Sequence, residues 1–284
     1  MEQFVLLVES GADFPADLAA RYGVQTVPMH VSFGADTKDD GSFPIEEIYS
    51  YFESTGSLTK TSGCTPDDFA RVFAAIREKE PHKPILHLAY SAVTTCSYQS
   101  ALVAAEGVPN VTSVDTKHVS AGQSLVTLLL ARYLEANPGC TTEDAVRKAE
   151  ELSARVKMGF FPGDLAYLRA GGRVSNAAYL GAKVLRLNPL IELKDGHLVA
   201  TKKYQGRMDK VAPRLLHDFV QANNFSRDIL AFVYSKGLSA AIHDEVDAAA
   251  REMGFKEILW IQTGGVVTTH CGPGGFGVCG ITAD

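Results

Sequence analysis

The sequence predicts an α/β protein whose first half is a parallel, doubly wound sheet of Rossmann-like type. Two observations lead to this class. Apolar strand-like runs alternate with amphipathic helical segments through the first half, which is the pattern of parallel β-α-β units. The 284 residues, 46% of them hydrophobic and 21% charged, also suffice for a substantial buried core.

The first half is read in order as strands and helices with identifiable ends. Phe4–Ser10 is an apolar strand, and the helix after it has Asp13 as its expected cap and Gly23 as its stop. Thr65 is expected to cap a helix over 66–79, since Pro66 and two aspartates fill its first turn. The remaining elements are expected at 24–33, 84–91 and 110–116 for strands, and at 98–106 and 120–136 for helices.

The second half differs from the first, and we place a domain boundary near residue 157. The segments are 1–157 and 158–284, with an amphipathic helix over 141–157 bridging them. Asp195-Gly196 lies between two alternating segments over 187–203, which predicts a hairpin with a type I′ turn. Helices at 208–222 and 240–254 alternate with strands at 228–235 and 257–262.

Composition excludes several classes of function. The net charge of −6, without a run of Lys and Arg, argues against nucleic acid binding. No apolar run reaches the roughly 20 residues needed to span a bilayer, and no signal peptide is read at the start. The five scattered cysteines lack a Cys-x-x-Cys motif, so we expect reduced thiols in the cytoplasm and no metal site.

Hydroxyl side chains gather where two expected strands end. Thr61 and Ser62 lie in "TSGCT", and Ser91 and Thr95 lie in "SAVTTCS". Ligands of doubly wound sheets bind beyond the carboxyl ends of strands, where hydroxyls and free N–H groups can hold an anion. The alternative is that these residues cap helices or form turns, as we expect for Thr65 and Asp115.

Two further positions stand out for their glycine-rich surroundings. His270 lies in "TTHCGPGGFG", where glycines allow the backbone to come close to a ligand. Gly171-Gly172 is a natural helix end, and Arg173 follows it. Arg173 either neutralises the dipole at that helix end or holds a carboxylate or phosphate.

These segments, in this order, resemble the DegV family of bacterial fatty-acid-binding proteins. The opening "VESGADFP" is similar to a family segment that usually reads D-S-T where this chain has Glu9-Ser10-Gly11. "KTSGCTPDDF", "LAYSAVTTCSYQSA", "SVDTKHVSAGQ", "YLRAGGRVS", "NPLIELKDGHL" and "THCGPGGFGV" resemble further family segments. The resemblance implies a parallel N-terminal domain, a C-terminal α/β domain with a mixed sheet, and a lipid tunnel between or within them.

The resemblance also implies a non-catalytic function. The chain would bind a long-chain fatty acid, without a further cofactor, and present it to a separate fatty acid kinase subunit, with transient contact to a membrane surface. Thr61, Ser91 and His270 would hold the carboxylate, and Arg173 would contact the partner or the phosphate. The neighbouring positions Ser62, Ala92, Thr95 and Gly272 would complete the carboxylate site.

The chain departs from the family pattern near this site, and two alternatives stay open. Where the family has Q-P, this chain has Gly63-Cys64, and the second serine of the family's S-S is Ala92 here. The family's L-S-G-T is replaced by Thr94-Thr95-Cys96-Ser97. The family often has a basic residue at about Gln205, where this chain has only Arg207 nearby. One alternative is an acyl hydrolase or transferase that pairs Cys96 or Cys271 with His270. In a strand, His270 and Cys271 would point to opposite faces and make a poor pair. The other alternative is a carrier of a different anionic lipid. We expect Cys64, Cys96 and Cys271 to be small core residues.

Overall fold

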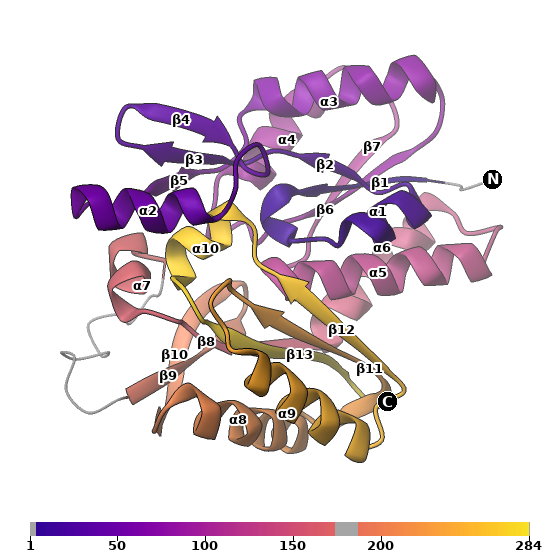
Figure 1. Cartoon of the computed structure of the whole chain (residues 1–284). Helices are drawn as coiled ribbons and strands as arrows, with labels where there is room; N and C mark the ends of the chain where they lie inside the picture. Colours follow the sequence, from indigo (N-terminus) through magenta and orange to yellow (C-terminus); the bar gives the residue numbers. More distant parts are fainter. Residues whose placement is uncertain (1–3, 174–186, 284) are drawn as a thin grey trace.

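The first layer is a parallel four-stranded sheet, which confirms the α/β class expected from the sequence (Figure 1). This computed structural model describes residues 4–173 and 187–283. The strand order is β2 (Gln25–Val27), β1 (Val5–Glu9), β6 (Ile85–Ala89) and β7 (Val111–Asp115), and every pair is parallel. The helices around it are α1 (Ala16–Tyr22), α3 (Pro66–Lys79), α4 (Ser97–Ala105), α5 (Ser120–Ala136) and α6 (Thr142–Arg155).

Local end signals place these helices well, with one exception. Thr65 caps α3 as expected, and Asp68 completes a reciprocal cap with it. Gly23 ends α1 in a left-handed conformation. Asp13 does not cap α1, because Pro15 occupies the capping position after a short 3₁₀ turn, η1 (Ser10–Ala12). The Asp13 carboxylate instead accepts a hydrogen bond from the Gly264 N–H at 2.7 Å, a contact across the chain that no local pattern reveals.

The segment expected as one strand over 24–33 is divided between two sheets. β2 ends at Val27, and β3 (His30–Phe33) begins a small antiparallel sheet of order β4-β3-β5. Its other strands are β4 (Asp36–Asp39) and β5 (Lys60–Ser62), and α2 (Glu46–Thr55) lies between them in sequence. The "TSGCT" segment therefore begins in a short antiparallel strand, and the expectation of a loop at the end of a parallel strand was wrong.

The second layer is a mixed six-stranded sheet. Its order is β10 (His197–Gln205), β9 (Leu187–Lys194), β8 (Val156–Phe161), β13 (Phe276–Thr282), β11 (Phe225–Tyr234) and β12 (Glu257–Gln262), and only β11–β12 is parallel. The predicted hairpin is confirmed, with His197 paired to Lys194 and both turn residues at positive φ. The helices are α7 (Leu165–Gly171), α8 (Met208–Asn223), α9 (Ala240–Glu252) and α10 (Gly265–Cys271).

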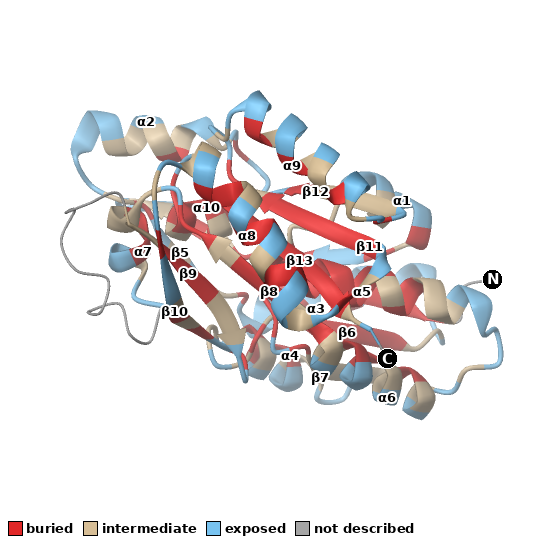
Figure 2. Ribbon diagram, turned by 90° about the horizontal axis from the view of Figure 1, so that it is seen from below, coloured by how far each residue is buried: buried red, intermediate tan, exposed pale blue. Residues whose placement is uncertain are grey.

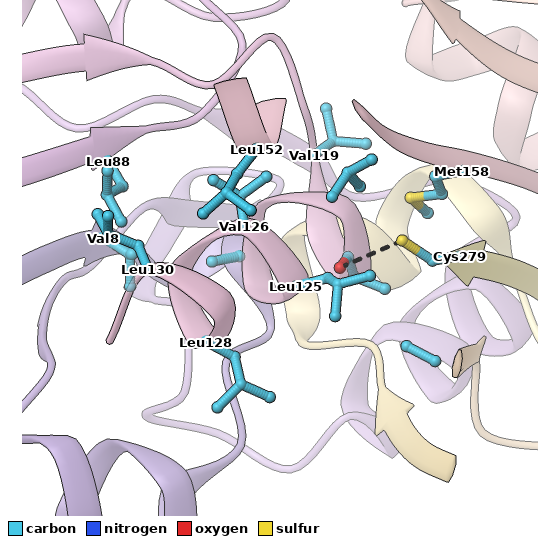
Figure 3. Close-up of a cluster of buried hydrophobic side chains, with 14 of the residues drawn as sticks. Val8, Leu88, Val119, Leu125, Val126, Leu128, Leu130, Leu152, Met158 and Cys279 are labelled. Carbon is cyan, nitrogen blue, oxygen red and sulfur yellow. Dashed lines mark hydrogen bonds between the residues drawn. The ribbon is translucent and has the colours of Figure 1, made fainter. Parts of the chain in front are cut away.

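Helix α5 lies between the two sheets, and all but one of its residues from 120 to 131 are buried (Figures 1 and 2). Figure 3 shows Val8 and Leu88 of the parallel sheet and Met158 and Cys279 of the mixed sheet around Leu125 and its helix neighbours. The Cys279 thiol also donates to the carbonyl oxygen of Ala121 at 3.6 Å. One hydrophobic core is thus shared by both halves of the chain, and a domain boundary at residue 157 stays a prediction.

Two negative findings apply to the described residues. None of their helices is long and apolar enough to cross a membrane. No three His, Cys, Asp or Glu side chains among them are grouped in a way that could hold a metal ion.

Candidate functional site

A cavity lies where the parallel sheet, the small sheet and the mixed sheet meet. Its walls are mostly apolar, with side chains from all three regions. They include Met29, Val119, Met158, Leu168, Val233 and Val266. A mostly apolar wall with a few polar side chains is typical of a site for a small apolar or amphipathic ligand.

The polar end of the cavity is built around a pair of residues that are 209 positions apart in sequence. Thr61 Oγ1 and His270 Nε2 are 2.7 Å apart, and both residues line the cavity. β5 positions Thr61 by pairing with β3, and the last turn of the short helix α10 positions His270. Burial, assisted by the charge of Arg173, lowers the pKa of His270 from 6.5 to about 4. The imidazole is therefore neutral near pH 7 and acts through hydrogen bonding.

The C-terminal end of α7 packs against the Nδ1 side of the His270 ring. A Cβ atom on Gly171 would collide with His270 Nδ1, so only glycine allows this approach. His270 Nδ1 is buried and has no hydrogen-bond partner among the described residues. The Arg173 guanidinium donates to the carbonyl oxygen of Gly171 at 2.6 Å and also lines the cavity. Arg173 thus serves the helix end and lies at the polar end of the cavity at once.

Two more of the residues named from the sequence line this cavity. Ser62 follows Thr61 on β5, and Thr95 lies in the turn before α4. Thr95 Oγ1 is 3.1 Å from the hydroxyl oxygen of Ser97, which itself accepts a hydrogen bond from the Cys64 N–H. The structure therefore brings Thr61, Ser62, Thr95, His270 and Arg173 to one cavity.

The structure does not bring Ser91, Ala92 and Gly272 to the cavity wall. The Ser91 hydroxyl donates to the carbonyl oxygen of Gly196 at 2.8 Å and is fully buried. The Ala92 N–H donates to Asp115, which acts as a turn residue as expected. The Gly272 carbonyl oxygen accepts from Ser235 at 2.6 Å and Gly272 ends α10. A direct contact of these three residues with a carboxylate stays a prediction.

The cysteines occupy two kinds of environment. Cys64 and Cys271 are fully or nearly buried, and burial raises the pKa of both thiols, which keeps them protonated and weakly nucleophilic. Cys96 is exposed at the start of α4, so the expectation that it fills the core was wrong.

His270 and Cys271 lie in the last turn of a helix, and our assumption of a strand was incorrect. Their side chains still diverge, since His270 meets Thr61 while Cys271 Sγ is 3.8 Å from the Ser235 hydroxyl oxygen. A paired nucleophile and base is therefore not formed by these neighbours.

Sequence reasoning missed several polar residues of the cavity, among them Tyr90 and Ser120. Tyr90 directly follows the last residue of β6, and Ser120 begins α5. The Ser120 hydroxyl donates to the carboxylate of Asp13. The place of Tyr90 at the end of a parallel strand was the available signal, but an aromatic residue there also fits an ordinary strand.

Comparison with known proteins agrees with this architecture. The model of the DegV family, described as a family of uncharacterised proteins, matches residues 3–283. The chain belongs to the DegV family. A Thermotoga maritima relative named "Fatty acid-binding protein" is 25% identical over 281 residues, covering 96% of each chain.

Two solved DegV structures show the same fold and are described by their fatty acid binding. A Thermus thermophilus DegV protein, described by its fatty acid binding, has a TM-score of 0.87 at 27% identity and covers 99% of this chain and 100% of its own. A Thermotoga maritima protein, described as revealing a fatty acid binding function, has a TM-score of 0.84 at 25% identity, with coverage of 99% and 100%. These names state binding, and none of them states an enzyme activity.

Proposed function

We propose that this chain is a non-catalytic carrier that binds a long-chain fatty acid in the cavity. The carboxylate lies at Thr61 and His270, and the acyl chain runs along the apolar wall. The observation that carries the proposal is the Thr61–His270 pair on the wall of a mostly apolar cavity. The fatty acid binding of related DegV proteins supports the same ligand class.

The head-group chemistry follows from a neutral His270. When Nε2 carries the proton, it donates to Thr61 Oγ1 across the 2.7 Å contact, and the Thr61 hydroxyl proton is then free to point at a carboxylate. Ser62 and Thr95 line the same cavity and offer further hydroxyls. A carboxylate leaving water needs donors of this kind, because its burial without them is costly.

The polar end decides whether a fatty acid leaves a membrane for this cavity. Burying about fifteen methylenes at roughly 0.8 kcal/mol each is worth on the order of 12 kcal/mol relative to water. A fatty acid in a bilayer already has that stabilisation. Net extraction therefore depends on the donors at Thr61 and His270 and on the shape of the wall.

We further propose that the bound acid is presented to a kinase subunit that phosphorylates its carboxylate. Arg173 supports this step, since its side chain is exposed while its residue lines the cavity. From that position it can guide a phosphoryl group or a partner surface without covering the carboxylate oxygen.

Binding is tested with a matched pair of hydroxyl deletions in one small sheet. After delipidation, the protein is titrated with palmitate, and ligand in the protein as purified is identified by native mass spectrometry. Thr61→Val is expected to weaken binding by about tenfold to a hundredfold, because one hydrogen bond to a charged group is lost. Thr37→Val removes a hydroxyl that bonds Ser32 at 2.8 Å on the neighbouring strands, outside the cavity wall, and should bind like wild type.

The proposal fails if wild-type protein carries no fatty acid and does not bind palmitate at micromolar concentration. If palmitate binds but Thr61→Val and Thr37→Val are equivalent, the head-group site at Thr61 is wrong.

A further inference from the structure

We infer that the Tyr90 hydroxyl is a head-group ligand in this chain, donating a hydrogen bond to the carboxylate of the bound acid. The inference rests on the proposed fatty acid binding. It assigns to Tyr90 the donor that the loop after β6 was expected to supply through Ser91.

The backbone of Tyr90 is fixed and its hydroxyl is free. Its N–H donates to Glu9 Oε2 at 2.9 Å, and the same carboxylate oxygen accepts from Gln123 at 2.9 Å. The side chain lines the cavity, and none of the hydrogen bonds among the described residues involves its hydroxyl. Tyr90 is half-buried, and its hydroxyl is not among the fully buried unpaired side-chain atoms of the described residues, so it can be reached from the cavity. A carboxylate in the cavity can accept a hydrogen bond from this free donor.

Tyr90 and the proposed head-group residues line the same cavity. The positive charge of Arg173 reaches both His270 and Tyr90, and it lowers the pKa of each. Burial, with the nearby carboxylates of Asp13 and Glu9, outweighs this effect and raises the pKa of Tyr90 well above its ordinary value. The phenol therefore stays protonated, as a donor to an anion must.

Ser91 and Ala92 cannot fill this position in the arrangement seen here. The Ser91 hydroxyl is committed to the Gly196 carbonyl in the β9–β10 turn, and Ala92 has no hydroxyl. A Cβ atom at Gly196 would also come within 2.6 Å of Ser91 Oγ, so the serine is tightly enclosed. Tyr90 is thus, beside Thr95, a residue of this loop whose hydroxyl can still reach a ligand.

Gly11 makes room for the Tyr90 ring. A Cβ atom on Gly11 would lie 3.0 Å from Tyr90 Cε2 and 2.8 Å from Met29 Sδ. The family pattern that this segment resembles has threonine here, and a threonine side chain would push the ring away from its position. Gly11 and Tyr90 therefore act as a matched pair that sets where the hydroxyl lies.

The test compares Tyr90→Phe with Tyr98→Phe, which removes a hydroxyl from α4 outside the cavity wall. Each delipidated variant is titrated with palmitate and with hexadecanol, which has the same chain length and no carboxylate. We expect Tyr90→Phe to lose about tenfold or more in palmitate affinity and less in hexadecanol affinity, because bonds to charged groups are the stronger ones. Tyr98→Phe should match wild type with both ligands, and Gly11→Thr should also weaken palmitate binding.

The outcomes separate this inference from the proposed function. Wild-type protein that fails to bind palmitate refutes the proposed function itself. Wild-type protein that binds palmitate while Tyr90→Phe binds it equally well overturns only the role of Tyr90. Equal losses for palmitate and hexadecanol also overturn it, since they indicate a change of shape and not the loss of a bond to the carboxylate. Thermal unfolding of each variant confirms that the retained ring keeps the fold.

Discussion

Replacing Asp13 by asparagine is expected to stabilise the protein increasingly as pH rises from about 5 to 8. The Asp13 carboxylate accepts from the Gly264 N–H at the start of α10 and from the Ser120 hydroxyl. Burial, aided by the charge of Asp40, raises the pKa of Asp13 from 3.8 to about 8 in spite of these bonds. Asparagine keeps the shape and cannot ionise. Its Oδ1 can still accept from the Gly264 N–H, while its Nδ2 group would donate to the Ser120 hydroxyl oxygen, which reverses that hydrogen bond.

The sign follows from proton binding. Between the unfolded pKa of 3.8 and the folded pKa of about 8, the folded wild type holds a proton that the unfolded chain releases. Wild-type stability from this group therefore falls as pH rises through that window, by at most about 1.4 kcal/mol per pH unit. Between pH 5 and pH 7 the variant should gain up to about 2.5 kcal/mol over wild type. Asp13 keeps some contact with solvent, which places the measured gain below this ceiling.

The assay is urea unfolding of both proteins at several pH values, read as the difference between them. The difference matters because burial lowers the pKa of His118 and His270 to about 4, which makes both proteins more stable as pH rises towards 6.5. Those contributions cancel between variant and wild type. Asp17→Asn, which removes an exposed carboxylate from the first turn of α1, controls for the loss of one charge.

A difference between Asp13→Asn and wild type that stays constant from pH 5 to pH 8 would refute the reasoning. It would mean that Asp13 is ionised in the folded protein throughout that range, and that the two hydrogen bonds outweigh burial.

Three further predictions concern the site and the core. Gly171→Ala should displace the His270 ring and lower palmitate affinity in titrations, while the circular dichroism spectrum stays that of wild type; unchanged affinity would show that the ring tolerates the methyl group. The Arg173→Ala variant should bind palmitate nearly as well as wild type, but acyl phosphate formation with a kinase subunit from the same cell should be slower. A wild-type rate of acyl phosphate formation would mean that Arg173 only stabilises the end of α7 through its hydrogen bond to Gly171. Leu125 is fully buried in α5, so Leu125→Ala should lower the free energy of unfolding, measured in urea titrations, by about 2–5 kcal/mol. A loss of stability well under about 1 kcal/mol would contradict the packing around Leu125.

Where neighbouring residues alone fix the backbone, the sequence predicted the structure well. The α3 helix begins at Pro66 because Thr65 and Asp68 bond each other's backbone N–H groups, and all of these residues lie within four positions. The β9–β10 turn forms at Asp195-Gly196 because both residues adopt positive φ, which a type I′ turn requires. The alternation of strands and helices likewise indicated parallel pairing.

The segment over 24–33 shows a case in which local sequence patterns do not predict the structure. Its residues favour extended backbone throughout, and that preference is satisfied equally by one strand or by two. Pairing with different partners decided the outcome, since β2 joins β1 while β3 joins β4 and β5.

The sequence by itself determined the candidate residues, and the tertiary structure decided which of them meet. Thr61 and His270 were recognisable as polar residues in unusual settings, yet their 2.7 Å contact depends on how β5 and α10 pack. The sequence around Ser91 indicated a ligand site equally well, but the Ser91 hydroxyl donates its hydrogen bond to the carbonyl oxygen of Gly196 in the hairpin turn. Tyr90 had no local mark beyond its place at a strand end, and its access to the cavity depends on the missing side chain of Gly11. Hydrogen bonds and close contacts between distant segments are fixed by packing, so no window of neighbouring residues could reveal them.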